Sequence, residues 1–265
     1  MDDAHELLGL ARELASQAAD LQLERLDQER TRVDTKSTVT DAVTEVDRAC
    51  ERLIVDGIRA ARSDDAILGE EGADVEGSSG YRWVIDPIDG TTNYLYGHPG
   101  FAVSIAVEHD GMAVAGVVQD PLHGDVFEAV AGEGAKRNGR PISVSAVEDP
   151  AMALVATGFG YEPLRRRAQG EVIGRLIGDI RDIRRMGAAA VDLCSVACGR
   201  VDAYFERGLN HWDLAAGGLI AVEAGARLGS IDGGEVRPGS VVAAPPALFE
   251  PLRELLLTAG AAEHD

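Results

Sequence analysis

The ten residues from Trp83 to Thr92 read WVIDPIDGTT and join an apolar run to two acids and two hydroxyls. The apolar run predicts a buried strand, because short apolar stretches closed by turn residues are typical of one. Pro87 and Gly90 interrupt the pattern, so we expect Asp86 and Asp89 to converge at the edge of a sheet. Paired carboxylates suit Mg²⁺, and a glycine before a hydroxyl suits the anion-binding start of a helix. The segment therefore predicts a site for a metal and a phosphate.

The composition limits the size of the core and the class of partner. The chain has 265 residues, with 25 Lys and Arg against 45 Asp and Glu, a net charge of −20. Because single cores stop growing near about 250 residues, we expect one large domain or two tightly packed halves. The halves are predicted at 1–148 and 149–265. The negative charge argues against nucleic-acid binding, since nucleic-acid phosphates would be repelled.

The cysteines and the apolar runs indicate the compartment. Cys50, Cys194 and Cys198 include no Cys-x-x-Cys pair, which favours a reducing cytoplasm and no structural zinc. Cys194 and Cys198 are predicted to pack as small apolar residues. The N-terminus lacks the basic start of a signal peptide, and no apolar run approaches the roughly 18 residues of a membrane span. We expect a cytoplasmic protein without membrane attachment.

Periodicity predicts strands in the first half and alternating strands and helices in the second. In the first half, helices are expected at 4–29 and 42–61 around a polar loop at 31–41, and strands at 66–68, 101–107, 113–118 and 126–130. Tight turns are predicted at His109-Asp110-Gly111 and Asn138-Gly139. In the second half, helices are expected at 163–178, 188–198, 213–224 and from 247, and strands at 182–186 and 201–205. This alternation indicates layers of sheets and helices.

Two further acids extend the predicted metal site. Glu70 lies in a Gly-Glu-Glu-Gly turn, and Asp213 begins an Ala/Gly-rich helix. Taken singly, an exposed loop acid and a helix N-cap are the commoner interpretations. Together with Asp86 and Asp89 they give four acids at the ends of buried elements. Such a set suits two or three divalent ions about 3.5–4 Å apart, an arrangement used in phosphoryl transfer.

Four segments together resemble the inositol monophosphatase family of magnesium-dependent, lithium-sensitive phosphatases. They are Asp41–Thr44 with Asp47, Gly69–Glu71, Asp86–Thr91 and Trp212–Gly217. The match runs along nearly the whole chain. It implies an α+β fold, a layered α/β/α/β/α sandwich with a mostly antiparallel N-terminal sheet and a smaller mixed C-terminal sheet. It also implies a homodimer.

The resemblance assigns roles to particular residues. The implied ligands of two or three Mg²⁺ are Glu70, Asp86, the carbonyl of Ile88, Asp89 and Asp213. Gly90 and Thr91 match the phosphate-binding turn, and Thr92 is expected beside them. Thr91 and Asp47 match a pair that activates the attacking water with Glu70, and Lys36 matches a basic residue of a loop that closes over the site.

Substrate selection is expected in the second half. Gly187, Ala188 and Ala189 stand where family members have a glycine, a small hydroxyl residue and an alanine. Ala188 therefore lacks the hydroxyl and either removes one substrate contact or leaves the backbone to act. Glu206, seven residues before Asp213, is expected to accept hydrogen bonds from substrate hydroxyls. The expected reaction is hydrolysis of inositol-1-phosphate by direct attack of a metal-activated water.

Related activities remain as alternatives. Fructose-1,6-bisphosphate and histidinol phosphate are plausible substrates, although the bland stretch 187–191 disfavours histidinol phosphate. Nucleotide 3′-phosphatases resemble this chain too, but they usually have a different, more basic second half. The run Arg165–Arg167 would favour a nucleotide, but it is expected to cap or decorate an exposed helix. A hypothesis of another class is a regulatory partner of the transcription machinery, as in some bacterial relatives. The net charge opposes direct RNA contact but not protein partners.

Overall fold

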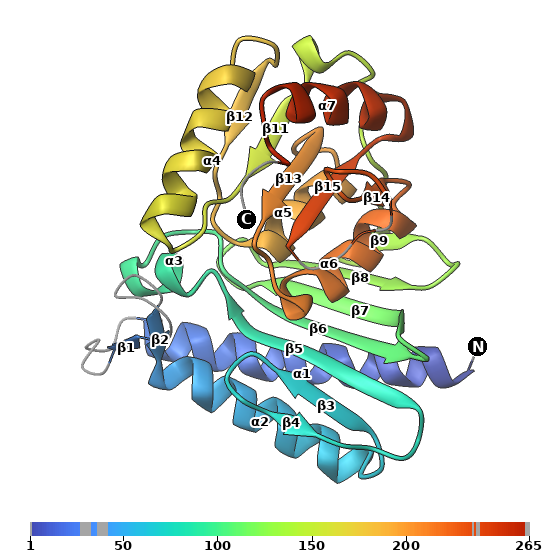
Figure 1. Cartoon of the computed structure of the whole chain (residues 1–265). Helices are drawn as coiled ribbons and strands as arrows, with labels where there is room; N and C mark the ends of the chain where they lie inside the picture. The colour runs from blue at the N-terminus through green and yellow to red at the C-terminus, as the bar shows by residue number, and fades with distance from the viewer. Residues whose placement is uncertain (1, 27–32, 36–41, 235, 237–238, 263–265) are drawn as a thin grey trace.

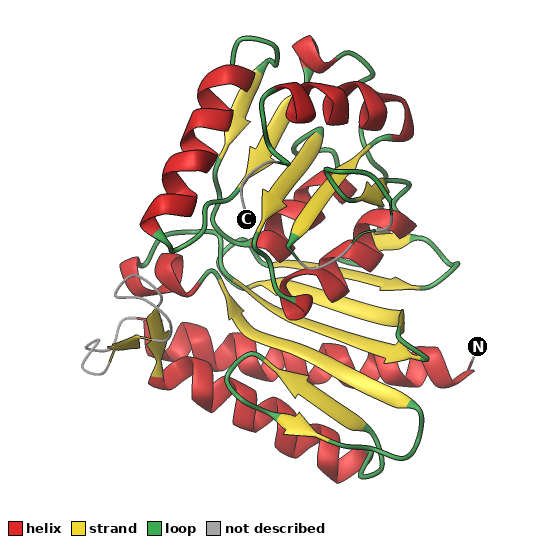
Figure 2. Cartoon of the chain, in the orientation of Figure 1, coloured by secondary structure: helices red, strands yellow, loops and turns green. Residues whose placement is uncertain are grey.

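The chain forms five layers, in which helix pairs alternate with two sheets (Figures 1 and 2). The computed structural model describes residues 2–26, 33–35, 42–234, 236 and 239–262. The order is helix pair, eight-stranded sheet, helix pair, five-stranded sheet and helix pair. This order confirms the predicted α/β/α/β/α sandwich.

The first layer consists of α1 (Asp2–Leu26) and α2 (Glu45–Ala61). Their apolar stripes pack on the face of the large sheet that carries Trp83 and Ile85. The prediction of a helix from residue 42 is wrong at its start, because Ala42–Thr44 forms β2 and pairs antiparallel with β1 (Val33–Thr35). The prediction of a loop at 31–41 is wrong at Val33–Thr35, because these residues form the strand that pairs with β2. Lys36 and Asp41 lie outside the described residues.

The large sheet has the order β10-β9-β8-β7-β6-β5-β3-β4, and every neighbouring pair is antiparallel except β3 and β5. Its strands are β3 (Ala66–Gly69), β4 (Asp74–Val75), β5 (Tyr81–Asp89), β6 (Ala102–His109), β7 (Met112–Asp120), β8 (Asp125–Val130), β9 (Ala135–Arg137) and β10 (Arg140–Pro141). Both predicted hairpin turns are confirmed. In each, two consecutive residues have positive φ, 51° and 77° at Asp110 and Gly111 and 51° and 72° at Asn138 and Gly139.

The small sheet is mixed, with the order β12-β11-β13-β15-β14. Its strands are β11 (Leu154–Thr157), β12 (Asp182–Arg184), β13 (Ala203–Arg207), β14 (Arg227–Gly229) and β15 (Ser240–Ala244). Strand β11 runs parallel to β12 and β13, whereas β15 is antiparallel to β13 and β14. The periodicity did not predict β11, β14 or β15. Helices α4 (Pro163–Leu176) and α7 (Pro246–Thr258) cover the outer face, and η1 (Pro150–Met152) precedes β11.

Helices α5 (Ala189–Ala197) and α6 (His211–Glu223) form the middle layer between the sheets. Small residues let α6 lie close to its neighbours. A Cβ at Gly116 of β7 would stand 3.2 Å from the Cα of Ala216, and one at Gly217 would stand 3.0 Å from the Leu193 side chain. The two middle helices therefore have little freedom to shift, which fixes the positions of their N-termini.

The strands of the two sheets divide near residue 148, yet α5 and α6 of the second half cover the sheet of the first. The division into halves at 1–148 and 149–265 thus stays a prediction. None of the helices in the described part of the chain is both long and apolar enough to cross a membrane.

Candidate active site

A bulge at the end of β5 brings Asp86 and Asp89 to the same face of the sheet. Asp86 pairs with Ser104 and Asp89 with Ala102, so three steps on β5 oppose two on β6. In a regular strand, residues three apart point to opposite faces, and one extra residue cancels this alternation. Both acids thus follow Val84 to the face covered by α5 and α6. The predicted convergence of the two acids is confirmed, and the bulge explains it.

Glu70 reaches the same edge from the neighbouring strand. Strands β3 and β5 are parallel, with Gly69 opposite Ile85, and the Glu70 N–H donates to the Ile85 carbonyl at 3.1 Å. The next step along each strand places Glu70 beside Asp86 at the carboxyl ends of both strands. The acid after a short apolar strand is therefore part of the pocket and not an isolated loop residue.

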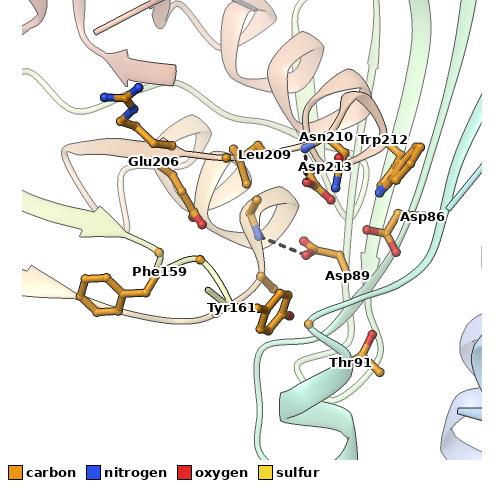
Figure 3. Close-up of a pocket in the computed structure, with 18 of the residues that line it drawn as sticks. Asp86, Asp89, Thr91, Phe159, Tyr161, Glu206, Leu209, Asn210, Trp212 and Asp213 are labelled. Atoms are coloured by element: carbon orange, nitrogen blue, oxygen red, sulfur yellow. Dashed lines mark hydrogen bonds between the residues drawn. The ribbon is translucent and has the colours of Figure 1, made fainter. Parts of the chain in front are cut away.

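Asp213 enters from the first turn of α6. The helix begins at His211 with Asn210 as its N-cap, so Asp213 is the third helical residue and not the cap. Its Oδ2 accepts the Asn210 N–H at 2.6 Å, which completes a capping box. Figure 3 shows Asp213 on the same side of the pocket as Asp86 and Asp89. Residues from opposite halves of the chain thus meet at one point.

Gly90 makes the turn from β5 into α3 (Thr91–Tyr96). Its φ of 88° is in the left-handed region, and a Cβ there would stand 2.7 Å from the Gly100 carbonyl oxygen. Both conformation and space therefore require glycine. The turn places the Thr91 hydroxyl 3.1 Å from Asp47 Oδ1 and 3.1 Å from the Ile88 carbonyl. Asp47 is fully buried on α2, so this contact links α2 to the end of β5.

Burial and neighbouring acids disfavour the charged forms of Asp86 and Asp89. Burial raises the pKa of Asp86 well above its ordinary value, and the nearby Glu70, Asp89 and Asp213 raise it further. Burial raises the pKa of Asp89 to about 7, although the N–H of Ala190 and then of Ala189 partly oppose this. These N–H groups, at 2.6 and 3.2 Å, belong to the first turn of α5. Ala188 is the N-cap residue of α5, but its side chain cannot accept a hydrogen bond. The Asp89 carboxylate caps the helix in its place.

The donor set fits a hard divalent cation, because clustered carboxylates with raised pKa values gain most from positive charge. The side chains do not yet stand as a coordination shell. In the described part of the chain, no group of three or more acidic, His or Cys side chains has the geometry of a metal site. Asp86 Oδ1 instead accepts the Ile88 N–H at 3.1 Å, and Asp89 and Asp213 also accept backbone N–H groups. A carboxylate has about four lone-pair sites, so these hydrogen bonds leave acceptor capacity for an ion.

A pocket of about 310 Å³ opens above these acids. Among the predicted site residues that the structure describes, all line it except Asp47, which is buried behind Thr91, and Thr92, which is exposed on α3. Glu206 lies on the far side in β13, and its Oε2 accepts the Tyr204 hydroxyl at 2.6 Å. Burial raises the pKa of Glu206 to about 7, partly opposed by that hydrogen bond.

Sequence reasoning missed several residues of the pocket. Arg165 lines it, so the expectation that the whole run Arg165–Arg167 only decorates an exposed helix is wrong for its first member. Arg185, Phe159 and Tyr161 line it as well. The signal available for Arg185 was its place two residues before Gly187. Phe159 and Tyr161 follow β11, a strand that the periodicity did not reveal.

Comparison with known proteins agrees with this geometry. The family model described as the inositol monophosphatase family matches residues 3–260. Inositol-1-monophosphatase of Mycobacterium leprae is 45% identical over 224 residues, which cover 80% of this chain and 77% of that protein. Nus factor SuhB of Pasteurella multocida is 45% identical over 214 residues, covering 79% and 80%.

Solved structures show the same fold. SuhB of Mycobacterium tuberculosis superposes with a TM-score of 0.84 at 40% identity and covers 98% of both chains. The extragenic suppressor protein SuhB of Bartonella henselae gives a TM-score of 0.90 at 33% identity, covering 95% of this chain and 98% of that one. The sequence match, the fold and the meeting of four acids agree, and the chain belongs to the inositol monophosphatase family.

Proposed function

We propose that the protein is a Mg²⁺-dependent hydrolase of phosphate monoesters, with inositol-1-phosphate as its first candidate substrate. The observation that carries the proposal is the meeting of Glu70, Asp86, Asp89 and Asp213 at one pocket from separate elements. Burial and mutual repulsion make this arrangement costly unless a cation binds there. Two or three Mg²⁺, held by these acids and the Ile88 carbonyl, would acidify the attacking water and stabilise the leaving ester oxygen.

The residues of the chain would orient the reactants. The Thr91 hydroxyl, which contacts Asp47 and the Ile88 carbonyl, would hydrogen-bond the attacking water, and Glu70 would accept the proton of that water. Gly90 brings the first turn of α3 close to the phosphate. Across the pocket, Glu206 would accept hydrogen bonds from substrate hydroxyls, with its carboxylate oriented by Tyr204.

Site variants test the proposal. Phosphate release from inositol-1-phosphate with Mg²⁺ should fall by at least about 100-fold in Asp89→Asn and in Asp213→Asn, since each removes a charge directed at the reaction. Glu171→Gln, which changes an exposed acid of α4, is the control and should keep full activity. Unchanged turnover in both site variants would refute the proposal. Fructose-1,6-bisphosphate and histidinol phosphate, assayed beside it, compare the alternative substrates.

A regulatory role is a second candidate, because relatives of 43–45% identity are named Nus factor SuhB. We propose binding to proteins of a transcription complex as this role. Retention of such proteins at physiological salt should be equal for the wild-type chain and for Asp89→Asn, because catalysis is not required. No retention by either would refute it. The predicted homodimer and cytoplasmic location remain proposals, which light scattering and cell fractionation would check.

A further inference from the structure

The pocket has a basic side as well as an acidic one. Arg165 and Arg185 line it together with the four acids. Arg165 is the third residue of α4, and Arg185 follows β12, so both come from the second half of the chain. Neither forms an ion pair with a carboxylate in the part of the chain that the structure describes. Arg185 is close enough to Glu206 and Asp192 to oppose the rise in pKa of both carboxyl groups, but outside a direct ion pair. In a chain of net charge −20, these two exposed guanidinium groups place positive charge at the pocket.

The backbone around these two side chains leaves room for them. A Cβ at Gly160 or Gly208 would stand 2.8 or 2.5 Å from the Arg165 side chain, and a Cβ at Gly187 would stand 2.0 Å from Arg185 Nη1. Any larger residue at these glycines would push the arginines out of their positions. All three glycines line the pocket themselves.

Aromatic residues lie next to the arginines on the basic side of the pocket. The Arg185 guanidinium carbon lies 5.9 Å from the centre of the Phe159 ring, within the range of a cation–π contact. Phe159 and Tyr161 belong to the loop after β11, and Figure 3 shows them away from Asp86, toward the other side of the pocket. This loop leads into the first turn of α4, which carries Arg165. Phe159 thus helps to hold Arg185 in place.

We infer that Arg165 and Arg185 form a second anion subsite that binds another phosphate of the substrate, so that a sugar or polyol bisphosphate is hydrolysed with a higher kcat/KM than the matching monophosphate. The inference rests on the proposed function, because the scissile phosphate occupies the acidic side. Two guanidinium groups match the nearly double negative charge of a phosphate monoester, and their planar forks suit its oxygens. Glu206, on the far side of the pocket from Asp86, would contact the hydroxyls of the carbon skeleton.

A matched substrate pair isolates the second phosphate. Fructose 1-phosphate and fructose 1,6-bisphosphate share the ester at carbon 1 and differ only in the phosphate at carbon 6. The readout is the ratio of kcat/KM for the bisphosphate to that for the monophosphate, with Mg²⁺ fixed. Wild-type protein should show a ratio above about 10, and Arg165→Gln and Arg185→Gln should each lower it about tenfold, as expected for a lost charge-assisted hydrogen bond.

Two control variants distinguish binding of a phosphate at Arg165 and Arg185 from a general effect of removing positive charge. Arg166→Gln removes an exposed charge from the same helix, next to Arg165 but outside the pocket, and should keep the wild-type ratio. Arg185→Lys should restore part of the ratio, because lysine keeps the charge and loses the fork. A ratio equal in wild type, Arg165→Gln and Arg185→Gln would overturn the inference.

Failure of the proposed function would look different. If wild-type protein hydrolysed neither the fructose esters nor inositol-1-phosphate, the phosphatase proposal would fail, and calorimetric binding of fructose 1,6-bisphosphate would still test the arginines. The subsite predicts weaker binding by about tenfold in each glutamine variant. Equal affinity in wild type and both variants would overturn it.

Discussion

Glu108 Oε1 lies 2.6 Å from His211 Nε2, which ties the first residue of α6 to the large sheet. Glu108 belongs to β6, is only 3% exposed, and also accepts from Arg82 Nε at 2.9 Å and Nη2 at 2.6 Å. Asp213 follows His211 by two residues. The pair is therefore in a position to fix where Asp213 points.

Glu108→Gln should weaken metal binding as well as the fold. The substitution removes the charge that holds His211, so we expect a loss of about 1–3 kcal/mol in unfolding free energy and a higher Mg²⁺ concentration for half-maximal activity. Arg82→Gln is the matched control, because it disturbs Glu108 from the side of β5 and leaves His211 in place. An equal Mg²⁺ requirement in the two variants would show that the His211 contact does not position Asp213.

The metal-free protein should become more stable as the pH falls. Burial raises the pKa of Glu206 to about 7 in the folded protein, against about 4.3 in an unfolded chain. The folded state therefore binds more protons between these values, and its stability decreases as the pH rises through this range. Thermal unfolding in EDTA should show a melting temperature that rises from pH 8 to pH 6, and the rise should be smaller in Glu206→Gln. An identical pH dependence in wild type and variant would contradict this reasoning.

Gly90→Ala should lower the free energy of unfolding much more than the same substitution in a turn where a Cβ meets no other atom. Gly90 and Gly111 both have positive φ, 88° and 77°, but only at Gly90 would a Cβ meet another atom closely, the Gly100 oxygen at 2.7 Å. Gly111→Ala should cost about 1–2 kcal/mol for the left-handed conformation alone. Gly90→Ala should cost more, because the clash adds to this strain. Urea unfolding of the two variants measures the difference, and equal losses would exclude the clash.

The Thr91 hydroxyl should affect turnover more than substrate binding. Its contact with Asp47 places it to orient the attacking water, so Thr91→Ala should lower kcat by about 100-fold with a small change in KM. Thr91→Ser keeps the hydroxyl and should retain most of the rate. If the alanine variant turned over as fast as the serine variant, the hydroxyl would have no part in the reaction.

The sequence predicted the acidic residues of the pocket more accurately than the strands and helices on which they lie. Asp86, Asp89 and Asp213 were recognisable because each follows or begins a strongly patterned segment. The bulge after Asp86 was not predictable, because it depends on the register with β6, a pairing between residues distant in sequence. The start of the helix at Asp213 was predicted two residues too late, because Asn210 is the N-cap and an acid three residues later also fits a cap.

The basic side of the pocket illustrates a different limit. In the sequence Arg165 looks like one of three helix-surface arginines, whereas in the fold α4 contacts the loop after β11, where Gly160 N–H donates to Gln169, and Arg165 lines the pocket. Strands β14 and β15 escaped prediction because their runs are short and built partly from alanine and glycine, which have low strand preference. Contacts across the sheet, and not local preference, decide their conformation.

Removal and restoration of the metal give the most direct test of Mg²⁺-dependent hydrolysis. Phosphate release from inositol-1-phosphate should stop when the protein is freed of divalent ions with EDTA, and it should return when excess Mg²⁺ is added. Asp86→Asn should not recover under the same treatment, because it loses the buried acid that Glu70, Asp89 and Asp213 surround. Mg²⁺-dependent turnover is therefore expected in the wild type and not in Asp86→Asn. Equal turnover in EDTA and in Mg²⁺ would contradict it.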